Sequence, residues 1–493
     1  MSSAARSRSP LAAPEPTCLY ERTARRLAAL IDGGTFKPGD RLPSVRSLAR
    51  NERVSISTVL EAYRLLEDGG KIAARPKSGY YVQATSSPRV LEPRSSRPTA
   101  RPTKVSIAEL VMMLIRDTRN PALIPLGAAI PDPSLLPTAR LHAIAAGIAR
   151  RHPARATAYE VPPGSTALRT QIARRALAAG IALAPEDIVI TSGGQEAMHI
   201  ALRAVCRPGD AVAIESPIYF GILQAIETLG LRAVEIPTHP RSGMDLGALA
   251  TALERNPIKA CLVIPSFSNP LGSVMPVEAK QALVALCAKR ELPLIECDIY
   301  GELPHAGDRP PAAKAFDQKG LVLHYSSFSK VLDPGFRVGW IAPGRYQAAV
   351  EREKLVTNIA TATLPQLALA EFMSGASFER HLRHVRRIYA RNVAAMAHAI
   401  ATWFPPGTRV TRPTGGFVLW VELAAHVDSL ALYERALRAG ISIAPGPIFS
   451  AKQGYRNCIR LNAARFTDQV ERAVATLGRL LPTSPSPVKE MSS

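Results

Sequence analysis

The spacing of apolar residues in LPSVRSLARNERVSISTVLEAYRLLEDGG (residues 42–70) predicts two short helices near the N-terminus. Pro43 and Ser44 would open the first helix, because proline is tolerated in the first turn and a serine hydroxyl can accept a free backbone N–H. A turn is expected at residues 51–54. The residues that recur at helical intervals in the first helix are Val45, Leu48 and Ala49.

The second helix would begin with Ser55 or Ser57 as its cap and end at Gly69 and Gly70. Its buried face is predicted to contain Val59, Tyr63 and Leu66. Two short helices around a tight turn form a helix-turn-helix. The following segment, KIAARPKSGYYVQ, has two β-prone arms around residues 76–79, which predicts a basic hairpin, or wing. The second helix would enter a major groove of DNA and the wing would follow phosphates.

The composition changes at residues 84–104, which are rich in Pro, Ser and Arg and show no apolar periodicity. This segment is predicted to be a flexible linker. Beyond it, short β-rich runs alternate with Ala-rich helical patterns, which predicts a parallel α/β sheet. The expected organisation is a disordered head (1–15), the DNA-binding domain (16–83), the linker, an effector domain (105–481) and a disordered tail (482–493).

Positive charge is concentrated near the N-terminus. The chain has a formal net charge of +21, and residues 1–104 hold 19 Lys and Arg against 9 Asp and Glu. This excess indicates a polyanionic partner, although an Arg-rich composition elsewhere accounts for part of the total.

The six cysteines form no CxxC pair and no spacing typical of a zinc site, so a reduced chain without a metal is expected. His381 and His384 lie among arginines, and a solvated helix face is favoured over a metal site there. No segment resembles a signal peptide or reaches the ~20 apolar residues of a membrane span, so a cytoplasmic protein with no membrane partner is expected.

A candidate reactive lysine lies in HYSSFSKVLDPGFRVGW (residues 324–340). Lys330 would attack an aldehyde only if its amine were partly desolvated and its pKa lowered. Ser327 and Ser329 offer hydroxyls on the same turn, and the fork of Arg337 suits two phosphate oxygens. An amine beside a phosphate clamp is what pyridoxal 5'-phosphate (PLP) requires.

Other segments supply groups that the same cofactor would need. DIVITSGGQEAMHIALRAV predicts a strand, a glycine turn and a helix, so the N–H groups of Gly193, Gly194 and Gln195 would form a phosphate cradle. Tyr219 in IESPIYFG could stack on a flat ring or simply pack in the core. Further polar groups follow apolar runs and could bond the ring: Asn269 in SNPLG, and Asp298 and Tyr300 in CDIYGEL.

The segment from Tyr20 to Val82, with PGDRLPSVRSLA, STVLEAYRLLEDGG and ARPKSGYYV, resembles the winged helix-turn-helix of GntR-type bacterial transcription regulators. Such proteins usually have Arg after the capping serine, whereas this chain has Ile56. The resemblance implies contacts with double-stranded promoter DNA. The candidate DNA-binding residues are Arg41, Arg46, Arg53, Ser55, Ser57, Thr58 and Lys77.

In order, SGGQEA, SPIYFG, SNPLG, CDIY, SFSK, PGFRVGW and IRLNAA resemble the type I PLP-dependent aminotransferase fold over residues 122–480. The resemblance implies an α/β domain with a smaller C-terminal α+β subdomain. Lys330 would hold PLP as an internal aldimine, and Arg460 would bind the α-carboxylate of an amino acid. Tyr159 would reach a phosphate across a homodimer interface, although a buried aromatic is nearly as strong an interpretation.

One position departs from this pattern. Relatives commonly show Glu-Asp-Asp, with the first Asp pairing the pyridinium nitrogen, whereas this chain has Glu296, Cys297 and Asp298. A thiol cannot balance a ring N–H⁺ as a carboxylate does, so the electron sink would be weaker. Neighbouring residues of a strand point to opposite faces, so Asp298 could replace Cys297 only if the strand had ended or bulged.

The whole arrangement resembles the MocR subfamily of GntR regulators, which implies a transcription regulator whose effector domain senses PLP or an amino compound joined to it. A linker of about twenty residues would let the two heads of a dimer reposition on separated half-sites. The alternatives are an active aminotransferase with an appended DNA-binding module, or another PLP enzyme such as a lyase or decarboxylase. The N-terminal block and Cys297 favour the regulator, and residual transaminase activity remains compatible with Lys330.

Overall fold

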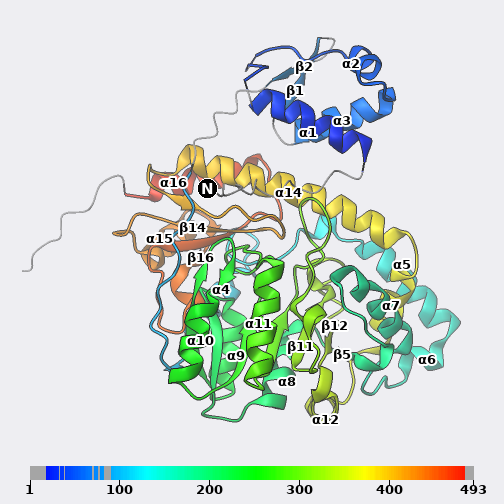
Figure 1. The fold of residues 1–493 in the computed structure, drawn as a ribbon, viewed down its shortest axis with the longest axis vertical. Coiled ribbons are helices and arrows are strands. Elements are labelled where there is room, and N and C mark those ends of the chain that lie inside the picture. The colour runs from blue at the N-terminus through cyan, green and yellow to red at the C-terminus, as the bar shows by residue number, and fades with distance from the viewer. Residues whose placement is uncertain are drawn as a thin grey trace, which may run out of the picture. The chain divides into compact units, whose positions relative to one another are not determined.

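The chain divides into two compact units, Met1–Pro88 and Arg89–Ser493 (Figure 1). The structure, a computed structural model, describes residues 18–32, 34–37, 39–68, 71–75, 78–82 and 90–482. The predicted disordered head, Gly69 and Gly70, Lys77, residues 84–89 of the predicted linker and residues 483–493 of the predicted tail lie outside the described residues.

The N-terminal unit is a winged helix-turn-helix. Its elements are α1 (Leu19–Asp32), α2 (Val45–Glu52), α3 (Ile56–Asp68), β1 (Ile72–Arg75) and β2 (Gly79–Val82). The Ser47 N–H donates to Ser44 Oγ at 3.2 Å, which caps α2, and the Thr58 N–H donates to Ser55 Oγ at 3.1 Å. Ser55 therefore caps α3, while Ser57 lies within the helix.

Tyr63 of α3 joins the helices to the wing. Its side chain is fully buried, and its hydroxyl donates to the Pro43 carbonyl at 2.5 Å. Its ring meets that of Tyr80 in the antiparallel β1–β2 hairpin at 4.7 Å between centroids. The Tyr63 side chain thus contacts both the segment before α2 and the wing. These contacts couple the orientation of α3 to that of the hairpin.

A mixed sheet forms the centre of the second unit. Its strands, in spatial order, are β3 (Thr103–Lys104), β7 (Arg232–His239), β6 (Ala211–Ser216), β9 (Ile258–Val263), β10 (Leu294–Cys297), β11 (Val322–Ser327), β12 (Gly339–Ala342) and β5 (Val189–Thr191), with β8 (Gly243–Met244) beside β7. Strands β7, β6, β9, β10 and β11 are parallel, whereas β12 is antiparallel to both of its neighbours. The predicted parallel α/β sheet is thus present, with β12 reversed inside it and with β3 and β8 pairing antiparallel to β7 at its edge.

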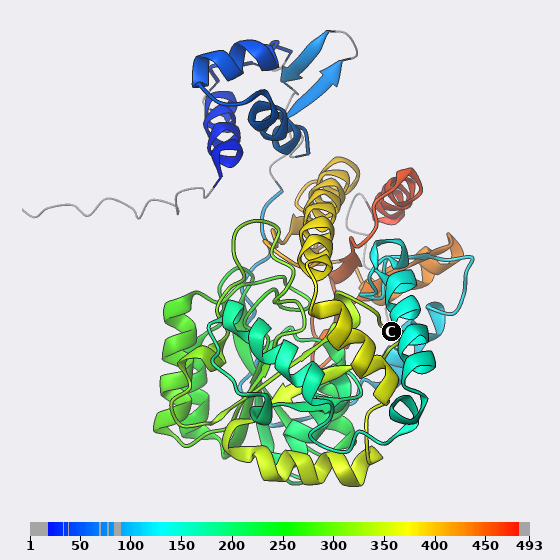
Figure 2. The same ribbon diagram turned by 90° about the vertical axis from the view of Figure 1, so that its right-hand side faces the viewer.

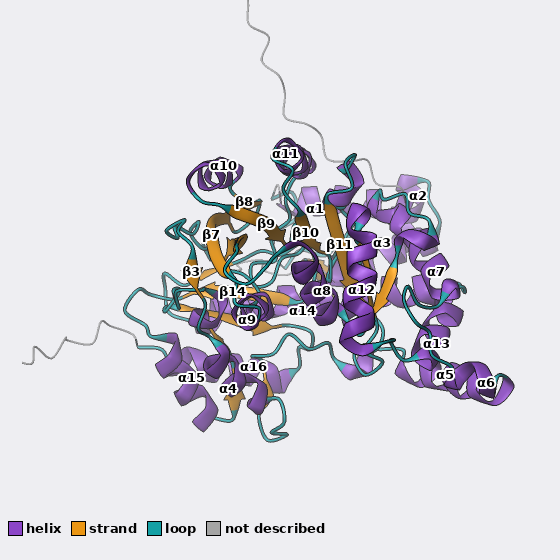
Figure 3. Ribbon diagram, turned by 90° about the horizontal axis from the view of Figure 1, so that it is seen from below, coloured by secondary structure: helices purple, strands orange, loops and turns teal. Residues whose placement is uncertain are grey.

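Helices cover both faces of this sheet, as Figure 3 shows for α10 and α11 on one face and α8 and α9 on the other. Alternate residues of β6 explain the two layers: Val212 and Ile214 pack with α8 and α9, whereas Ala211 and Ala213 pack with α10 and α11. The helices of this part are α4 (Ala108–Asp117), α5 (Thr138–Arg151), α6 (Pro153–Thr157), α7 (Thr166–Ala176), α8 (Gly194–Val205), α9 (Phe220–Thr228), α10 (Leu246–Arg255), α11 (Val277–Lys289), α12 (Gln347–Asn358) and α13 (Thr363–Met373).

The C-terminal part is a smaller α+β subdomain. An antiparallel sheet in the order β13-β14-β17-β16 packs with α14 and α16, which lie side by side in Figure 2 in yellow and red. A short parallel pair, β4 with β15, adds a segment that follows β3 in the chain. The elements are β4 (Ile124–Pro125), α14 (Ser377–Trp403), β13 (Arg409–Val410), β14 (Val418–Glu422), α15 (Ser429–Arg438), β15 (Ile441–Ser442), β16 (Ala444–Pro445), β17 (Cys458–Asn462) and α16 (Asp468–Leu480).

The structure differs from the sequence prediction for residues 90–104, which the composition assigned to a flexible linker. The Arg94 N–H donates to Glu422 Oε2 at 2.9 Å, and the Thr238 N–H donates to Ser96 Oγ at 2.7 Å. Strand β3 then pairs with the edge strand β7. This segment is bound to the effector domain because an exposed strand edge and the Glu422 carboxylate satisfy its backbone groups, while the Ser96 hydroxyl satisfies the Thr238 N–H.

Among the described residues, no helix has both the length and the apolar character that a membrane crossing needs.

We expect the packed segment to stabilise the effector domain. A chain that begins at residue 105 should unfold at a lower temperature than one that begins at residue 90, because it lacks the β3 pairing and both hydrogen bonds. At about 1 kcal/mol for each hydrogen bond, the loss should be roughly 2 kcal/mol or more by chemical denaturation. Equal stability of the two truncated chains would mean that residues 90–104 are only a tether. Ser96→Ala in the longer chain isolates one of the hydrogen bonds.

Candidate functional site

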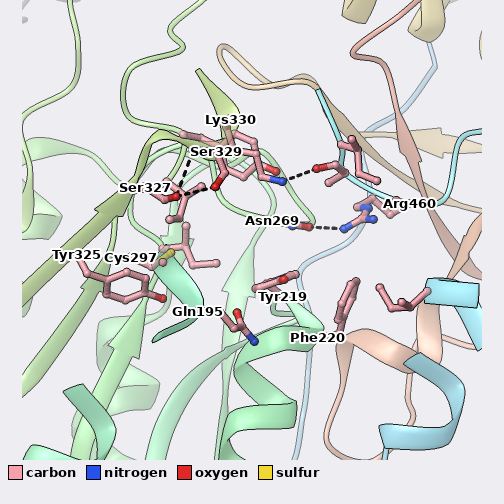
Figure 4. Close-up of a pocket in the computed structure, with 18 of the residues that line it drawn as sticks. Gln195, Tyr219, Phe220, Asn269, Cys297, Tyr325, Ser327, Ser329, Lys330 and Arg460 are labelled. Atoms are coloured by element: carbon pink, nitrogen blue, oxygen red, sulfur yellow. Dashed lines mark hydrogen bonds between the residues drawn. The ribbon is translucent and has the colours of Figure 1, made fainter. Parts of the chain in front are cut away.

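A cavity of about 280 Å³ opens where several strands of the large sheet end (Figure 4). Strands β6, β9, β10 and β11 all end toward it, so side chains distant in sequence come together at the carboxyl edge of the sheet. Of the residues predicted from the sequence, those that line the cavity are Gly194, Gln195, Tyr219, Asn269, Tyr300, Ser327, Ser329, Lys330, Arg337 and Arg460.

Lys330 ends a single 3₁₀ turn, Phe328–Lys330, that follows β11 directly. Its Nζ donates to the Ala129 carbonyl at 2.6 Å and no carboxylate of the described chain pairs with it. Burial, together with the positive charges of Arg460 and Arg337, lowers the pKa of the Lys330 amine from 10.5 to about 8. A substantial fraction of this amine is therefore neutral, and so nucleophilic, near physiological pH.

The glycine turn before α8 and Arg337 form a concave anion site. Gly193 has a φ of +86°, and a Cβ placed there would lie 2.5 Å from Arg337 Nη2, so the turn requires glycine. Arg337 itself has a φ of +51°, and its Nη1 donates to Ser329 Oγ at 3.2 Å. The N–H groups at the start of α8 and this guanidinium together suit a phosphate dianion.

A network missed by the sequence analysis holds this turn from α12. The Ser192 N–H donates to Glu196 Oε2 at 2.6 Å, and Lys354, which is fully buried, donates to the same oxygen at 2.8 Å. Asn358 donates to Ser192 Oγ at 3.0 Å. Glu and Lys separated by more than 150 residues give no local signal, so sequence spacing could not have revealed this pair.

Arg460 of β17 is a fully buried cation on the other side of Lys330. Its Nη1 donates to Asn269 Oδ1 at 3.0 Å, and its Nη2 donates to the Gly127 carbonyl. The rings of Phe449 and Phe220 lie 5.1 and 5.9 Å from its guanidinium carbon. Burial lowers the pKa of Arg460 to about 10. Within the described chain, no carboxylate pairs with this guanidinium, and its Nε has no hydrogen-bond partner. The site therefore favours an anionic ligand group.

Cys297, the last residue of β10, lines the cavity, whereas Asp298 does not. The Asp298 carboxylate forms an ion pair with Arg309, and His324 Nε2 lies 3.7 Å from it. The expectation that Asp298 binds the cofactor is therefore wrong in this structure, because strand alternation directs its side chain to the opposite face. Burial raises the pKa of the Cys297 thiol to about 12, so it faces the cavity as a neutral group.

His324 and Glu296 extend the buried ionic cluster behind the cavity. His324 Nδ1 lies 2.9 Å from Glu296 Oε2. Burial alone would raise the pKa of the Glu296 carboxyl, but His324 and two backbone N–H groups outweigh this effect and lower the pKa to about 2. Arg309 also pairs with Glu302, whose carboxylate accepts from Arg175 at 2.6 Å. These contacts fix the 298–302 turn that carries Tyr300 into the cavity.

Besides Asp298, two predicted cofactor residues lie outside the cavity lining. Gly193 lies immediately before it, where its conformation sets the turn. Tyr159 is 78% exposed and does not line the cavity of its own chain. The buried aromatic interpretation of Tyr159 is therefore wrong, and contact with a partner subunit stays a prediction.

Other cavity residues were not predicted. Ile115 and Thr118, at and just after the end of α4, lie before the segment that carried the family resemblance, and Phe220 follows Tyr219. Ala128, Ala129 and Ile130 form one further stretch of the wall. Single side chains of this kind, in a helix or a loop, form no recognisable motif, so their place in the cavity could not be predicted from the sequence.

The candidate DNA-binding residues gather at the helix-turn-helix. Arg46 in α2 and Arg53 in the turn are exposed, as is Arg41 before α2. The hydroxyls of Ser57 and Thr58 both lie 2.7 Å from Ser55 Oγ at the start of α3. Ile56 is 52% exposed there, so an apolar side chain occupies the position where Arg is usual.

Comparison with known proteins agrees with this geometry. The model of the class I and II aminotransferases matches residues 129–477. The chain belongs to this family. The model of the bacterial regulatory proteins of the gntR family matches residues 19–82. The predicted fusion of a GntR winged helix-turn-helix with a type I aminotransferase fold is therefore confirmed.

Full-length relatives share both domains of this aminotransferase-family chain. It is 40% identical over 449 residues to the uncharacterized HTH-type transcriptional regulator YjiR of Escherichia coli, covering 90% of this chain and 94% of that one. It is 27% identical to the probable rhizopine catabolism regulatory protein MocR of Rhizobium meliloti, covering 87% and 86%. The chain therefore has the MocR architecture of a transcription regulator.

A solved relative supports the effector fold. LysN, the α-aminoadipate aminotransferase of Thermus thermophilus, was solved in complex with N-(5'-phosphopyridoxyl)-L-leucine, and it superposes with a TM-score of 0.70 at 31% identity, covering 74% of this chain and 94% of that one. PLP is the cofactor that this family model and this relative indicate.

The residues present fit PLP. The Gly193–Gln195 turn and Arg337 would hold the phosphate, Lys330 would bind the aldehyde carbon, and Asn269 and Tyr300 would face the ring oxygen. The buried Tyr300 hydroxyl has no hydrogen-bond partner within the described chain, which leaves it free for such a contact. When bound, PLP withdraws electrons from the Cα of an attached amino compound. No group of three or more His, Cys, Asp and Glu side chains in the described part could hold a metal ion.

The lowered pKa of Lys330 predicts the pH dependence of cofactor uptake. For the cofactor-free protein, the rate of PLP capture should rise with pH around a midpoint near 8, because the neutral amine is the nucleophile. Arg460→Gln should move the midpoint upward, since one neighbouring positive charge is removed. Borohydride trapping followed by mass spectrometry measures the capture, with Lys330→Ala as the blank. A midpoint near 10.5, the ordinary value for lysine, would contradict the proposed environment.

Proposed function

We propose that this regulator acts as a homodimer, binds promoter DNA through residues 16–83, and senses PLP or an amino compound joined to it in the effector domain. The proposal is supported chiefly by one observation: a pocket whose residues fit PLP shares a chain with a GntR head, and it presents the neutral Cys297 where the family resemblance implies a carboxylate. A pocket that binds the cofactor but weakens its electron sink suits recognition better than rapid turnover.

Thermodynamic linkage between ligand binding and DNA binding explains how the ligand would regulate the protein. A ligand that binds one arrangement of the dimer more tightly shifts the population toward that arrangement, and so changes the geometry offered to DNA. The exposed Tyr159 supports a dimer, because its hydroxyl is available to a phosphate site in a second copy. A protein with this function works beside the chromosome, in the cytoplasm.

A second candidate function is catalysis by the effector domain. Lys330, with its lowered pKa, and the buried Arg460 are the groups an aminotransferase uses to hold a cofactor and a substrate carboxylate. Cys297 distinguishes the two functions, since it decides how strongly the pyridine ring can accept electrons.

Footprinting on the promoter next to the protein's own gene tests the regulator function. We expect protection by the full chain, and we expect PLP to change the protection pattern in the wild type but leave it unchanged in Lys330→Ala. The affinity should fall steeply as salt is raised, because phosphate contacts release counterions. A chain beginning at residue 90 should give no protection, and retained protection would contradict the assignment of the head.

Arginine variants locate the DNA-binding surface. Arg46→Ala and Arg53→Ala should each weaken binding by about tenfold, the loss typical of one base or phosphate contact. Arg26→Ala is the matched control, because Arg26 is also exposed but its Nη1 already pairs with Glu52 at 2.9 Å. Equal losses in all three variants would point to net charge alone.

Replacing Cys297 tests the second function. Cys297→Asp should accelerate conversion of bound PLP to its aminated form by at least about tenfold, because a carboxylate at this place stabilises positive charge on the ring nitrogen. Cys297→Ser is the control for a polar but uncharged group. Spectroscopic single-turnover measurements with an amino acid give the rates. Wild-type steady-state turnover at about ten per second, the typical rate of enzymes, would favour the aminotransferase.

A further inference from the structure

Part of the cavity wall consists of apolar side chains that have no role toward PLP. Ile115 of α4 and Ile130 are 39% and 46% exposed, and both line the cavity. Ala128 and Phe220 continue the same apolar lining. Large apolar side chains that face a cavity and solvent gain stability when a ligand covers them.

This wall is attached to the residues that hold the reactive ends of a ligand. The Gly127 carbonyl accepts from Arg460, the Ala129 carbonyl accepts from Lys330 at 2.6 Å, and the Ile130 carbonyl accepts from Asn462 Nδ2 at 2.9 Å. Residues 127–130 are therefore fixed beside both the α-carboxylate site and the amine. A substituent on the Cα of a bound amino acid would lie close to this wall.

The cavity lining has no charged side chain left to pair with a charge on a ligand side chain. Its lining contains three cations, of which Arg337 serves phosphate, Lys330 the aldehyde carbon and Arg460 an α-carboxylate. No Asp or Glu is part of that lining, which consists entirely of described residues. A second carboxylate, or a side-chain ammonium, would lose its water without gaining an ionic partner.

We infer that the amino compound sensed by this protein is an α-amino acid with an uncharged, apolar side chain. The inference rests on the proposed function and names the ligand class of its site. The α-carboxylate binds Arg460, the α-amino group lies at Lys330, and the side chain covers Ile115, Ile130 and Phe220. Acidic and basic amino acids are disfavoured because their second charge would lie against an apolar wall without an ionic partner.

The test uses the full-length, PLP-loaded protein titrated with leucine, glutamate and lysine. The visible absorbance of the cofactor and the thermal midpoint of unfolding are followed together. Leucine should give half-saturation at a concentration at least about tenfold lower than glutamate or lysine, because an apolar pocket rejects an unpaired charge. Equal or tighter binding of glutamate or lysine overturns the inference, as does the absence of any response to leucine while PLP stays bound.

A substitution that places a charge in the apolar wall tests the ligand preference more strictly than the titrations alone. Ile115→Arg should improve glutamate binding and weaken leucine binding, so that the leucine-to-glutamate preference falls roughly tenfold. Met112→Arg is the matched control, since Met112 is 47% exposed on the same helix but does not line the cavity. If both variants change the preference equally, or neither does, the apolar wall does not select the ligand.

These measurements separate the inference from the proposed function. If the wild-type protein shows no visible cofactor absorbance, it does not bind PLP, and both proposals fail. Intact PLP binding with a preference for charged amino acids would contradict only the ligand class. Footprinting in the presence of leucine and glutamate then reports which amino acid alters DNA binding.

Discussion

The Arg460 guanidinium is buried among Phe449, Phe220 and polar oxygen atoms, and no carboxylate of the described chain neutralises it. A buried charge of this kind is unfavourable until an anion arrives, and the surrounding structure must hold it in place. Asn269 and the Gly127 carbonyl do so, and the same positive charge helps to lower the pKa of Lys330. The unpaired charge of Arg460 thus provides the carboxylate site and also helps to keep the Lys330 amine neutral.

The parallel sheet brings this chemistry together. Strands β6, β9, β10 and β11 end on one edge, and each is followed within a few residues by a side chain that reaches the cavity. The apolar layers on both faces give the sheet its rigidity, so short loops can hold polar groups in fixed positions. Behind the cavity, the Asp298–Arg309 pair holds the turn that delivers Tyr300.

Local patterns were sufficient to predict much of this protein. Helical spacing identified α2 and α3, and short motifs identified Lys330, Arg337, Asn269 and Arg460 as neighbours of one cavity. Strand alternation correctly raised the doubt about Asp298, because only one of two adjacent residues can face the cofactor. The missed features are contacts between distant segments: the Glu196–Lys354 pair, the apolar wall from α4, and the pairing of β3 with β7. The composition of residues 90–104 predicted a flexible linker because it contains no information about the strand edge that binds them.

The attachment of residues 90–104 to the effector domain changes the reach of the DNA-binding head. Only eight residue steps separate Val82, the last residue of the wing, from Val90. A fully extended chain of that length spans at most about 30 Å. In the proposed homodimer, a tether of this length would limit how far each head can move from its anchor point and would raise its local concentration at a nearby half-site. In that dimer, the permitted distance between operator half-sites would then be set mainly by the separation of the two anchor points, which the bound ligand would control.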